Sequence, residues 1–157
     1  ARRQLRHIVD VQVAVDAIDE PNFFLVGPDE ESDQWVSSVA KAAEAPYVTL
    51  RKTRRGDNDV SVDFPEIAQF RGLAPVLIDD IISSGRTMEV AVSQLLAHGL
   101  SSPVIVGVHG IFAEDSHQRL LAAGAVQVIS TNTVPHSTNA IDLSAMIATT
   151  VTKLIAP

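Results

Sequence analysis

The sequence holds 157 residues, 46% of them hydrophobic, with a mean hydropathy of +0.18 and a formal net charge of −7. This length fits one domain with a real core, and no apolar run approaches the roughly 20 residues that a membrane span needs. The acidic net charge argues against nonspecific nucleic-acid binding, and the absence of cysteine excludes disulfides and thiolate metal sites. We expect a cytoplasmic protein, because a cysteine-free chain without a signal-peptide pattern fits that compartment.

Apolar runs and helical spacings alternate along the first half of the chain. The predicted elements are a leading helix within residues 1–20, a strand at 23–26, a helix from Ser32 or Asp33 to about Glu44, and a strand at 47–50. Residues 51–65 are polar and charged and show no periodicity, except that Val60 and Val62 alternate with polar residues. This pattern predicts a flexible loop or a hairpin.

The second half repeats the alternation more regularly. The predicted elements are a strand at 76–79, a helix to about His98, a strand at 103–108, a helix at 114–123, a strand at 126–129 and a last helix at 143–154. Strands that alternate with helices indicate a parallel sheet covered on both faces. We therefore predict an α/β fold, a three-layer, doubly wound and mainly parallel sheet, in a single domain over residues 1–157.

Residues 76–87, with the sequence VLIDDIISSGRT, carry the strongest functional signal. The apolar strand ends in Asp79 and Asp80, and a polar turn then leads into a helix. The turn consists of Ser83, Ser84, Gly85, Arg86 and Thr87. Hydroxyl and N–H groups at a helix N-terminus favour a phosphate, whereas two carboxylates at the end of a strand favour the hydroxyls of a polyol or a metal ion.

A sugar phosphate satisfies both demands of residues 76–87. The alternative is a buried strand followed by a helix that Ser83, Ser84 and Thr87 cap. That alternative leaves the two consecutive carboxylates unexplained.

Residues 76–87 resemble the 5-phosphoribosyl-1-pyrophosphate (PRPP) motif of type I phosphoribosyltransferases and PRPP synthetases, in which four apolar residues precede Asp-Asp and a polar loop ends in Thr. Three later segments, Gly107–Phe112, Ser130–Pro135 and Ile141–Ser144, look like segments of PRPP synthetases that ordinary phosphoribosyltransferases lack. The resemblance implies that the chain is the second of two similar halves of such an enzyme.

PRPP synthetases join ribose 5-phosphate to the pyrophosphoryl group of Mg-ATP and release AMP. The resemblance implies that Asp79 and Asp80 hold the ribose hydroxyls and that residues 83–87 hold the 5-phosphate. It implies ATP, PRPP and the missing first half as partners, and we also expect a homo-oligomer.

Two basic residues, Lys52 and Arg54, fall where PRPP synthetases place a flexible loop with a catalytic Lys and Arg. The resemblance implies that they stabilise the phosphoryl group during its transfer. The alternative is a solvated basic run on the surface.

The segment after the first strand matches the pyrophosphate loop of PRPP synthetases only in part. Pro28 and Asp29 agree with the family pattern, but Glu31 and Ser32 replace its glycines. In the family the matching Asp contacts the metal, so the resemblance implies Asp29 as a ligand of Mg²⁺. The acids next to it have a second interpretation as helix N-terminal acids that the helix dipole stabilises.

The first prediction of function is therefore the C-terminal domain of a PRPP synthetase. The acidic replacement in the pyrophosphate loop favours a second class, a noncatalytic regulatory or interaction subunit. A third class is a stand-alone phosphoribosyltransferase, which needs a base-binding segment that the sequence does not show.

Overall fold

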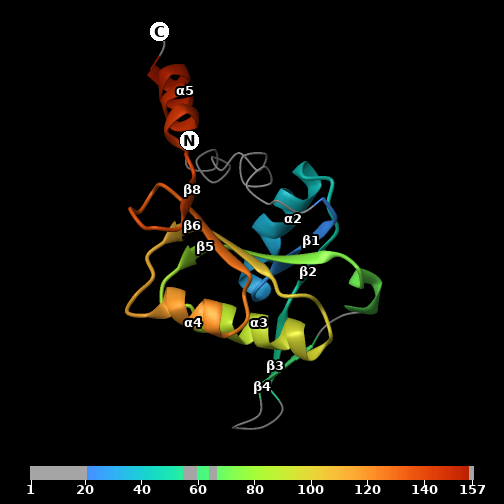
Figure 1. Cartoon of the computed structure of the whole chain (residues 1–157). Coiled ribbons are helices and arrows are strands. Elements are labelled where there is room, and N and C mark those ends of the chain that lie inside the picture. Colours follow the sequence, from blue (N-terminus) through green and yellow to red (C-terminus); the bar gives the residue numbers. More distant parts are fainter. Residues whose placement is uncertain (1–20, 55–59, 64–66, 156–157) are drawn as a thin grey trace.

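The computed structural model describes residues 21–54, 60–63 and 67–155, with the backbone alone for those between 51 and 68. The leading helix expected within residues 1–20 lies outside the described residues. Six parallel strands form the central sheet in the order β2-β1-β5-β6-β7-β8 (Figure 1). They are β1 (Phe23–Gly27), β2 (Tyr47–Thr49), β5 (Ala74–Ile82), β6 (Val104–Gly110), β7 (Gln127–Thr131) and β8 (Asn139–Ile141).

The direction of winding reverses between β1 and β5. From β1 the chain moves outward to β2, returns to the other side of β1 as β5, and then continues outward through β6, β7 and β8. In the register, Leu25 of β1 lies opposite Val76 of β5, and Asp79 lies opposite Gly107 of β6. Open α/β sheets bind ligands at the carboxyl ends of the strands beside such a reversal, and this places the ends of β1 and β5 at the expected site.

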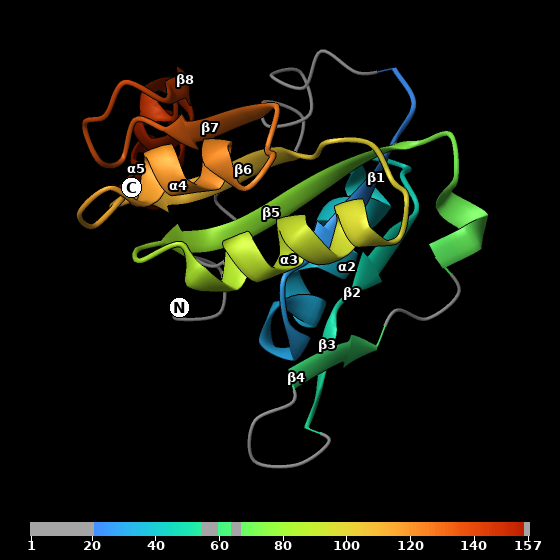
Figure 2. The ribbon, with the colours of Figure 1, turned by 60° about the horizontal axis from the view of Figure 1, so that its bottom comes forward.

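Helices cover the two faces of the sheet unequally. They are the 3-10 helices η2 (Glu30–Ser32) and η3 (Ile67–Phe70) and the α-helices α2 (Asp33–Ala42), α3 (Arg86–Ala97), α4 (Ser116–Ala122) and α5 (Ser144–Ile155). Helices α3 and α4 cover one face, where Leu95 packs with Leu77 in one core cluster (Figure 2). Helix α2 lies on the opposite face, where Val36 packs with Ile78 in a second cluster. The predicted three-layer α/β architecture is confirmed.

The last helix, α5, departs from the expected arrangement. It lies where the sequence predicts a helix, yet none of its residues is buried, and Ile147, Val151, Leu154 and Ile155 are exposed. In Figure 1 it projects away from the sheet instead of covering it. Among the described helices, none has the length and apolar character that crossing a membrane requires.

The structure refines the sequence prediction at the hairpin, at β5 and at the last strand. The expected loop or hairpin contains two antiparallel strands, β3 (Arg51–Arg54) and β4 (Val60–Asp63), which form a sheet of their own and extend away from the main sheet (Figures 1 and 2). The hairpin interpretation is therefore confirmed for these residues, and the flexibility of 51–65 stays a prediction. Strand β5 continues beyond Asp79 to Ile82, because β6 extends beside it as far as Gly110. The short strand β8 was not predicted.

Candidate functional site

The predicted phosphate loop lies between the end of β5 and the start of α3. Ser83 and Ser84 are exposed, Thr87 is half-buried, and a small cavity of about 130 Å³ runs from Asp79 to Met88 along this turn. Gly85 is the N-cap of α3, and no side chain caps that helix. The alternative of a helix capped by Ser83, Ser84 or Thr87 is therefore wrong, and these hydroxyls stay available to a ligand.

The first peptide groups of this loop point in the same direction, with their carbonyl oxygens toward residues 111–113. The carbonyl oxygen of Ile82 accepts from the N–H groups of Ile111 and Phe112, and the carbonyl oxygen of Ser83 accepts from the N–H of Ala113. None of the backbone hydrogen bonds described outside the helices and strands is donated by residues 83–87. Since the N–H of a trans peptide points opposite to its C=O, the N–H groups that follow these carbonyls turn away from residues 111–113. This polarity suits an anion.

Gly85 has a backbone conformation and surroundings that favour glycine. Its φ is +72°, in the left-handed region, and a Cβ built on it would lie 3.3 Å from Cβ of Ser116 on α4. An L side chain in this region costs roughly 1–2 kcal/mol. Glycine thus allows the loop to turn sharply and to lie directly against α4.

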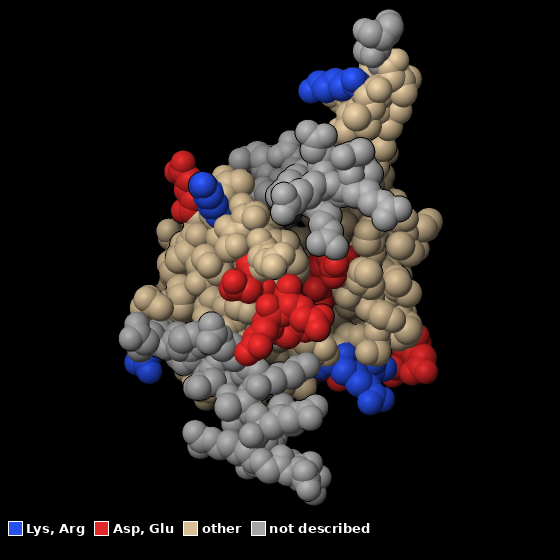
Figure 3. Space-filling view, turned by 180° about the vertical axis from the view of Figure 1, so that it is seen from behind, with Lys and Arg blue, Asp and Glu red and all other residues tan. Residues whose placement is uncertain are grey.

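The two consecutive carboxylates have different environments. Asp80 is exposed, whereas Asp79 is half-buried and accepts from the backbone N–H of Asp80 at 2.9 Å. Burial, followed by repulsion from Asp80 and Asp29, raises the pKa of Asp79 to about 7. Acidic side chains gather in one patch on the face shown in Figure 3. Asp29, from the end of β1, and the acids of β5 therefore lie near enough to share one electrostatic field.

We expect Asp79→Asn to raise the melting temperature more at pH 8 than at pH 5. The pKa of Asp79 is higher in the folded chain, at about 7, than its ordinary value of 3.8, so the stability of the folded chain falls as the pH rises through this interval. After a discount for solvent screening, the neutral amide should stabilise the chain by about 1–2 kcal/mol at pH 8. Thermal denaturation across this pH range measures the effect.

Asp142→Asn is the matched control for Asp79→Asn. Hydrogen bonds from Ser144 hold the pKa of Asp142 below its ordinary value, so its charged form is favourable in the folded chain. Its substitution should therefore lower stability at pH 8. An Asp79→Asn effect that does not change with pH would contradict the assignment of the raised pKa to this side chain.

The segment predicted to bind pyrophosphate is closed by its own hydrogen bonds. Asp29 caps η2, where its carboxylate and its carbonyl oxygen both accept from the backbone N–H of Ser32 at 3.2 Å. The hydroxyl of Ser32, which is buried, donates to the carbonyl oxygen of Asp29. An N–H that a glycine-rich loop would offer to pyrophosphate is thus occupied within the chain.

Magnesium is the one cofactor that the sequence predicts. No group of three His, Cys, Asp or Glu side chains that could hold a metal ion occurs among the described residues. Mg²⁺ usually takes one or two carboxylates and completes its coordination with water and substrate phosphates. The carboxylates of Asp29, Asp79 and Asp80 are hard oxygen donors whose mutual repulsion a cation relieves, so they fit such a site.

The predicted catalytic residues lie apart from the loop in sequence. Lys52 and Arg54 belong to β3, where the backbone pairs them with Val62 and Val60 of β4. Their side chains lie outside the described part of the structure. The strand follows β2, which borders β1, so the hairpin begins beside the strand that ends near Asp29.

Residues near the ends of β6 and β7 serve the structure. The hydroxyls of Thr131 and Thr133 donate to the carbonyl oxygen of Val108 at 2.6 and 2.9 Å. The Nδ1 atom of His109 lies 2.8 Å from the Thr133 hydroxyl. These contacts join β6 to the turn after β7 and give these polar side chains partners within the chain.

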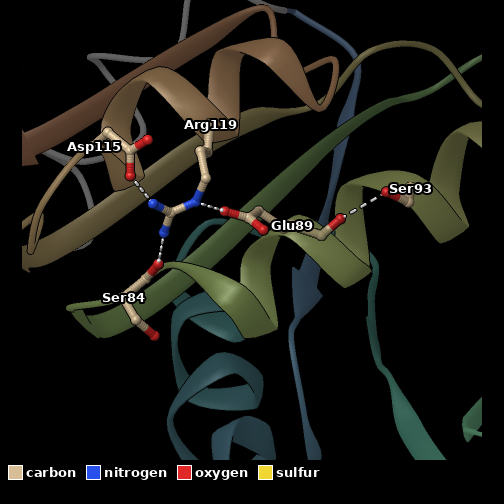
Figure 4. A network of polar contacts seen from close by, with 5 residues as sticks. All are labelled: Ser84, Glu89, Ser93, Asp115 and Arg119. Atoms are coloured by element: carbon tan, nitrogen blue, oxygen red, sulfur yellow. Dashed lines mark hydrogen bonds and ion pairs between the residues drawn. The ribbon is translucent and has the colours of Figure 1, made fainter.

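Sequence reasoning missed Arg119. Figure 4 shows its guanidinium between α4 and α3, where it contacts Glu89, Asp115 and the carbonyl oxygen of Ser84. Its position in a short helix gives no signal in the sequence, because the approach of α4 to the loop is a tertiary contact.

A larger hollow of about 710 Å³ lies at the opposite, amino end of the strands, around Asn22, Arg71 and Gly99. It borders Pro21, where the described part of the chain begins, and none of the predicted site residues lines it. The small cavity at the carboxyl end of β5 remains the candidate site, because the acids and the phosphate loop meet there.

Comparison with known proteins agrees with this geometry. The family model for the phosphoribosyl transferase domain matches residues 11–144. Ribose-phosphate pyrophosphokinases of Sulfurisphaera tokodaii and Corynebacterium efficiens are 29% and 33% identical over 130 and 129 residues, which cover 80% and 78% of this chain but 44% and 38% of those proteins. The chain thus spans less than half the length of these relatives.

A solved structure shares the fold over most of this chain. The phosphoribosylpyrophosphate synthetase from Mycobacterium smegmatis aligns with a TM-score of 0.72 at 25% identity, over 92% of this chain and 49% of that one. The fold is that of the type I phosphoribosyltransferases. On the family match and this geometry together, the chain belongs to the phosphoribosyl transferase domain family.

Proposed function

We propose that this chain is the ribose 5-phosphate-binding half of a ribose-phosphate pyrophosphokinase. The observation that carries the proposal is the turn after β5, where the carbonyl groups of residues 82–84 turn inward. The N–H groups and hydroxyls of residues 83–87 are left to a ligand there, beside two carboxylates near the end of β5. The identity to pyrophosphokinases supports this class over other members of the family.

In this proposal the chain binds and orients the sugar phosphate. N–H and hydroxyl groups of residues 83–87 hold the 5-phosphate, and Asp79 and Asp80 accept from the ribose hydroxyls. The 1-hydroxyl oxygen then attacks the β-phosphorus of ATP and releases its proton to water. The bond from that phosphorus to the α-phosphate oxygen breaks, so that PRPP forms and AMP leaves. Lys52 and Arg54 stabilise the charge on the transferred group.

A cation at Asp29, with Asp79 or Asp80, would neutralise charge on the phosphates when it is bound. The raised pKa of Asp79 supports this arrangement, because a neighbouring positive charge favours the ionised carboxylate, which can accept hydrogen bonds from hydroxyl groups. The sequence expectations of a cytoplasmic homo-oligomer belong to the same proposal.

The test is calorimetry of ribose 5-phosphate and of inorganic phosphate against Asp80→Asn. Loss of a charged hydrogen bond costs roughly 1.5–3 kcal/mol, so the affinity for ribose 5-phosphate should fall at least tenfold while that for phosphate stays unchanged. The double variant Ser84→Ala, Thr87→Val is the matched control, which should weaken both ligands. An equal loss for both ligands in Asp80→Asn would assign this acid to folding or to metal binding.

A second candidate function is a noncatalytic regulatory homologue that keeps the sugar-phosphate site. The closed turn at Asp29 and Ser32 favours it, because its internal bonds occupy the N–H that pyrophosphate would need. Binding of ribose 5-phosphate together with inactivity of the full-length protein would decide for this candidate.

A further inference from the structure

The guanidinium of Arg119 joins three parts of the molecule. Its Nε donates to the Glu89 carboxylate of α3 at 2.7 Å, and a second nitrogen pairs with Asp115, four residues earlier on its own segment. Its third nitrogen donates to the carbonyl oxygen of Ser84 at 2.6 Å, in the phosphate loop (Figure 4). One side chain thus ties α4, the start of α3 and the loop together.

The contact with Ser84 completes a row of three inward carbonyls. Backbone N–H groups of residues 111–113 hold the carbonyls of Ile82 and Ser83, but a side chain holds the carbonyl of Ser84. Because the peptide is planar and trans, a carbonyl that points to Arg119 sends the N–H of Gly85 in the opposite direction. Of the three N–H groups that follow the inward carbonyls, that of Gly85 lies nearest the start of α3, where the helix dipole also attracts an anion.

The peptide between Ser84 and Gly85 needs this external support. Glycine reaches left- and right-handed conformations with similar ease, so its own backbone does little to keep the peptide plane from turning over. A turned plane would present a carbonyl oxygen to the anion in place of an N–H. Within the part of the chain that the structure describes, the carbonyl oxygen of Ser84 accepts a hydrogen bond from Arg119 and from no other group.

We propose that Arg119 is a positioning residue that fixes the Ser84–Gly85 peptide with its N–H toward the bound phosphate. The inference rests on the proposed function, since it explains how that same loop is held ready. Arg119 is not itself a phosphate ligand: the two carboxylates that it contacts carry more negative charge than its single positive charge, and its nitrogens point to Glu89, Asp115 and Ser84. The planar fork of arginine matches these three acceptors, whereas the ammonium of lysine is a point charge.

The experiment is nuclear magnetic resonance of the 157-residue chain, with inorganic phosphate as the probe. The carbonyl carbon shift of Ser84 reports the hydrogen bond from Arg119, and the amide shift of Gly85 reports the phosphate. Arg119→Gln removes both the charge and the planar fork of donors, whereas Arg119→Lys keeps the charge. Arg71→Gln is the matched control, because Arg71 lies by the hollow at the amino end of the strands.

We expect the Ser84 carbonyl shift to move in both Arg119 variants before any phosphate is added. The affinity for phosphate should fall about tenfold in Arg119→Gln. Across the variants, the loss of affinity should grow with the change in the Ser84 carbonyl shift. Arg71→Gln should behave as the wild type. Wild-type affinity in a variant whose Ser84 carbonyl shift has moved would overturn the proposal. Should Arg119→Gln fail to fold, Arg119→Lys and Glu89→Gln supply the same correlation.

The two proposals fail differently in this experiment. If phosphate moves no amide of residues 83–87 in the wild-type chain, the proposed function is refuted and the role of Arg119 with it. If phosphate binds there equally in the wild type and in Arg119→Gln, the positioning role alone is refuted. A lower melting temperature without a change in the Ser84 shift would show that the residue serves stability only.

Discussion

The isolated chain should release no AMP from Mg-ATP and ribose 5-phosphate above the background of a Lys52→Ala, Arg54→Ala variant. Phosphoryl transfer needs both substrates fixed in line with cations around the moving group. We propose that residues 83–87 hold the sugar phosphate, whereas the turn at Asp29 and Ser32 is closed by its own hydrogen bonds. The chain also spans less than half the length of its pyrophosphokinase relatives. A coupled assay for AMP checks this expectation.

The full-length protein should release AMP from Mg-ATP and ribose 5-phosphate. The Lys52→Ala, Arg54→Ala variant should then lower this rate about 10³-fold, which is the lower end of the effects seen when a cation that stabilises a transferred phosphoryl group is removed. Lys41→Ala, an exposed lysine near the end of α2, is the matched control and should be neutral. Turnover by the isolated chain would contradict the first expectation. An inactive full-length protein that still binds ribose 5-phosphate would support the regulatory candidate.

Gly85→Ala should abolish measurable phosphate binding and destabilise the chain by about 1–3 kcal/mol. The alanine would have to adopt a φ of +72°, and its Cβ would lie 3.3 Å from Cβ of Ser116, which α4 holds in place. The loop would therefore move away from α4 and from Arg119. Calorimetry with inorganic phosphate and thermal denaturation measure the two effects.

Gly99→Ala is a control that separates the effect of backbone strain from the effect of displacing the loop at residues 83–87. Its φ is +77°, nearly that of Gly85, yet a Cβ there would meet nothing within 4 Å. It should therefore cost similar strain and leave phosphate binding unchanged. Equal phosphate affinity in Gly85→Ala and Gly99→Ala would show that the loop does not depend on its contact with α4.

The strand, turn and helix around the candidate site can be predicted from the sequence. Residues 76–87 are continuous in the chain, so an apolar run, two carboxylates and a polar turn already carry the information on strand, acids and phosphate loop. The length of β5 could not be predicted, because Ile81 and Ile82 join the strand only through pairing with His109 and Gly110. Pairing between distant segments has no periodic signal in either one.

The residues that hold the site in place could not be predicted from the sequence. Arg119 reaches Ser84 across 35 positions, and its charge pattern resembles any solvated arginine of a surface helix. Likewise, Ser32 looks like a simple helix cap in the sequence, whereas the structure buries it and bonds it to Asp29. Such roles depend on which elements pack together, and a single sequence leaves this open.

The row of inward carbonyls at Ile82, Ser83 and Ser84 sets the order in which the cradle can form during synthesis. When residue 87 has been added to the growing chain, the whole loop has been synthesised, but the donors at residues 111–113 and 119 are not yet made. The nascent loop therefore remains unbraced until β6 has paired with β5 and α4 has docked. Because contacts between distant segments form slowly, we expect the cradle to mature late in folding, after the strands that carry it.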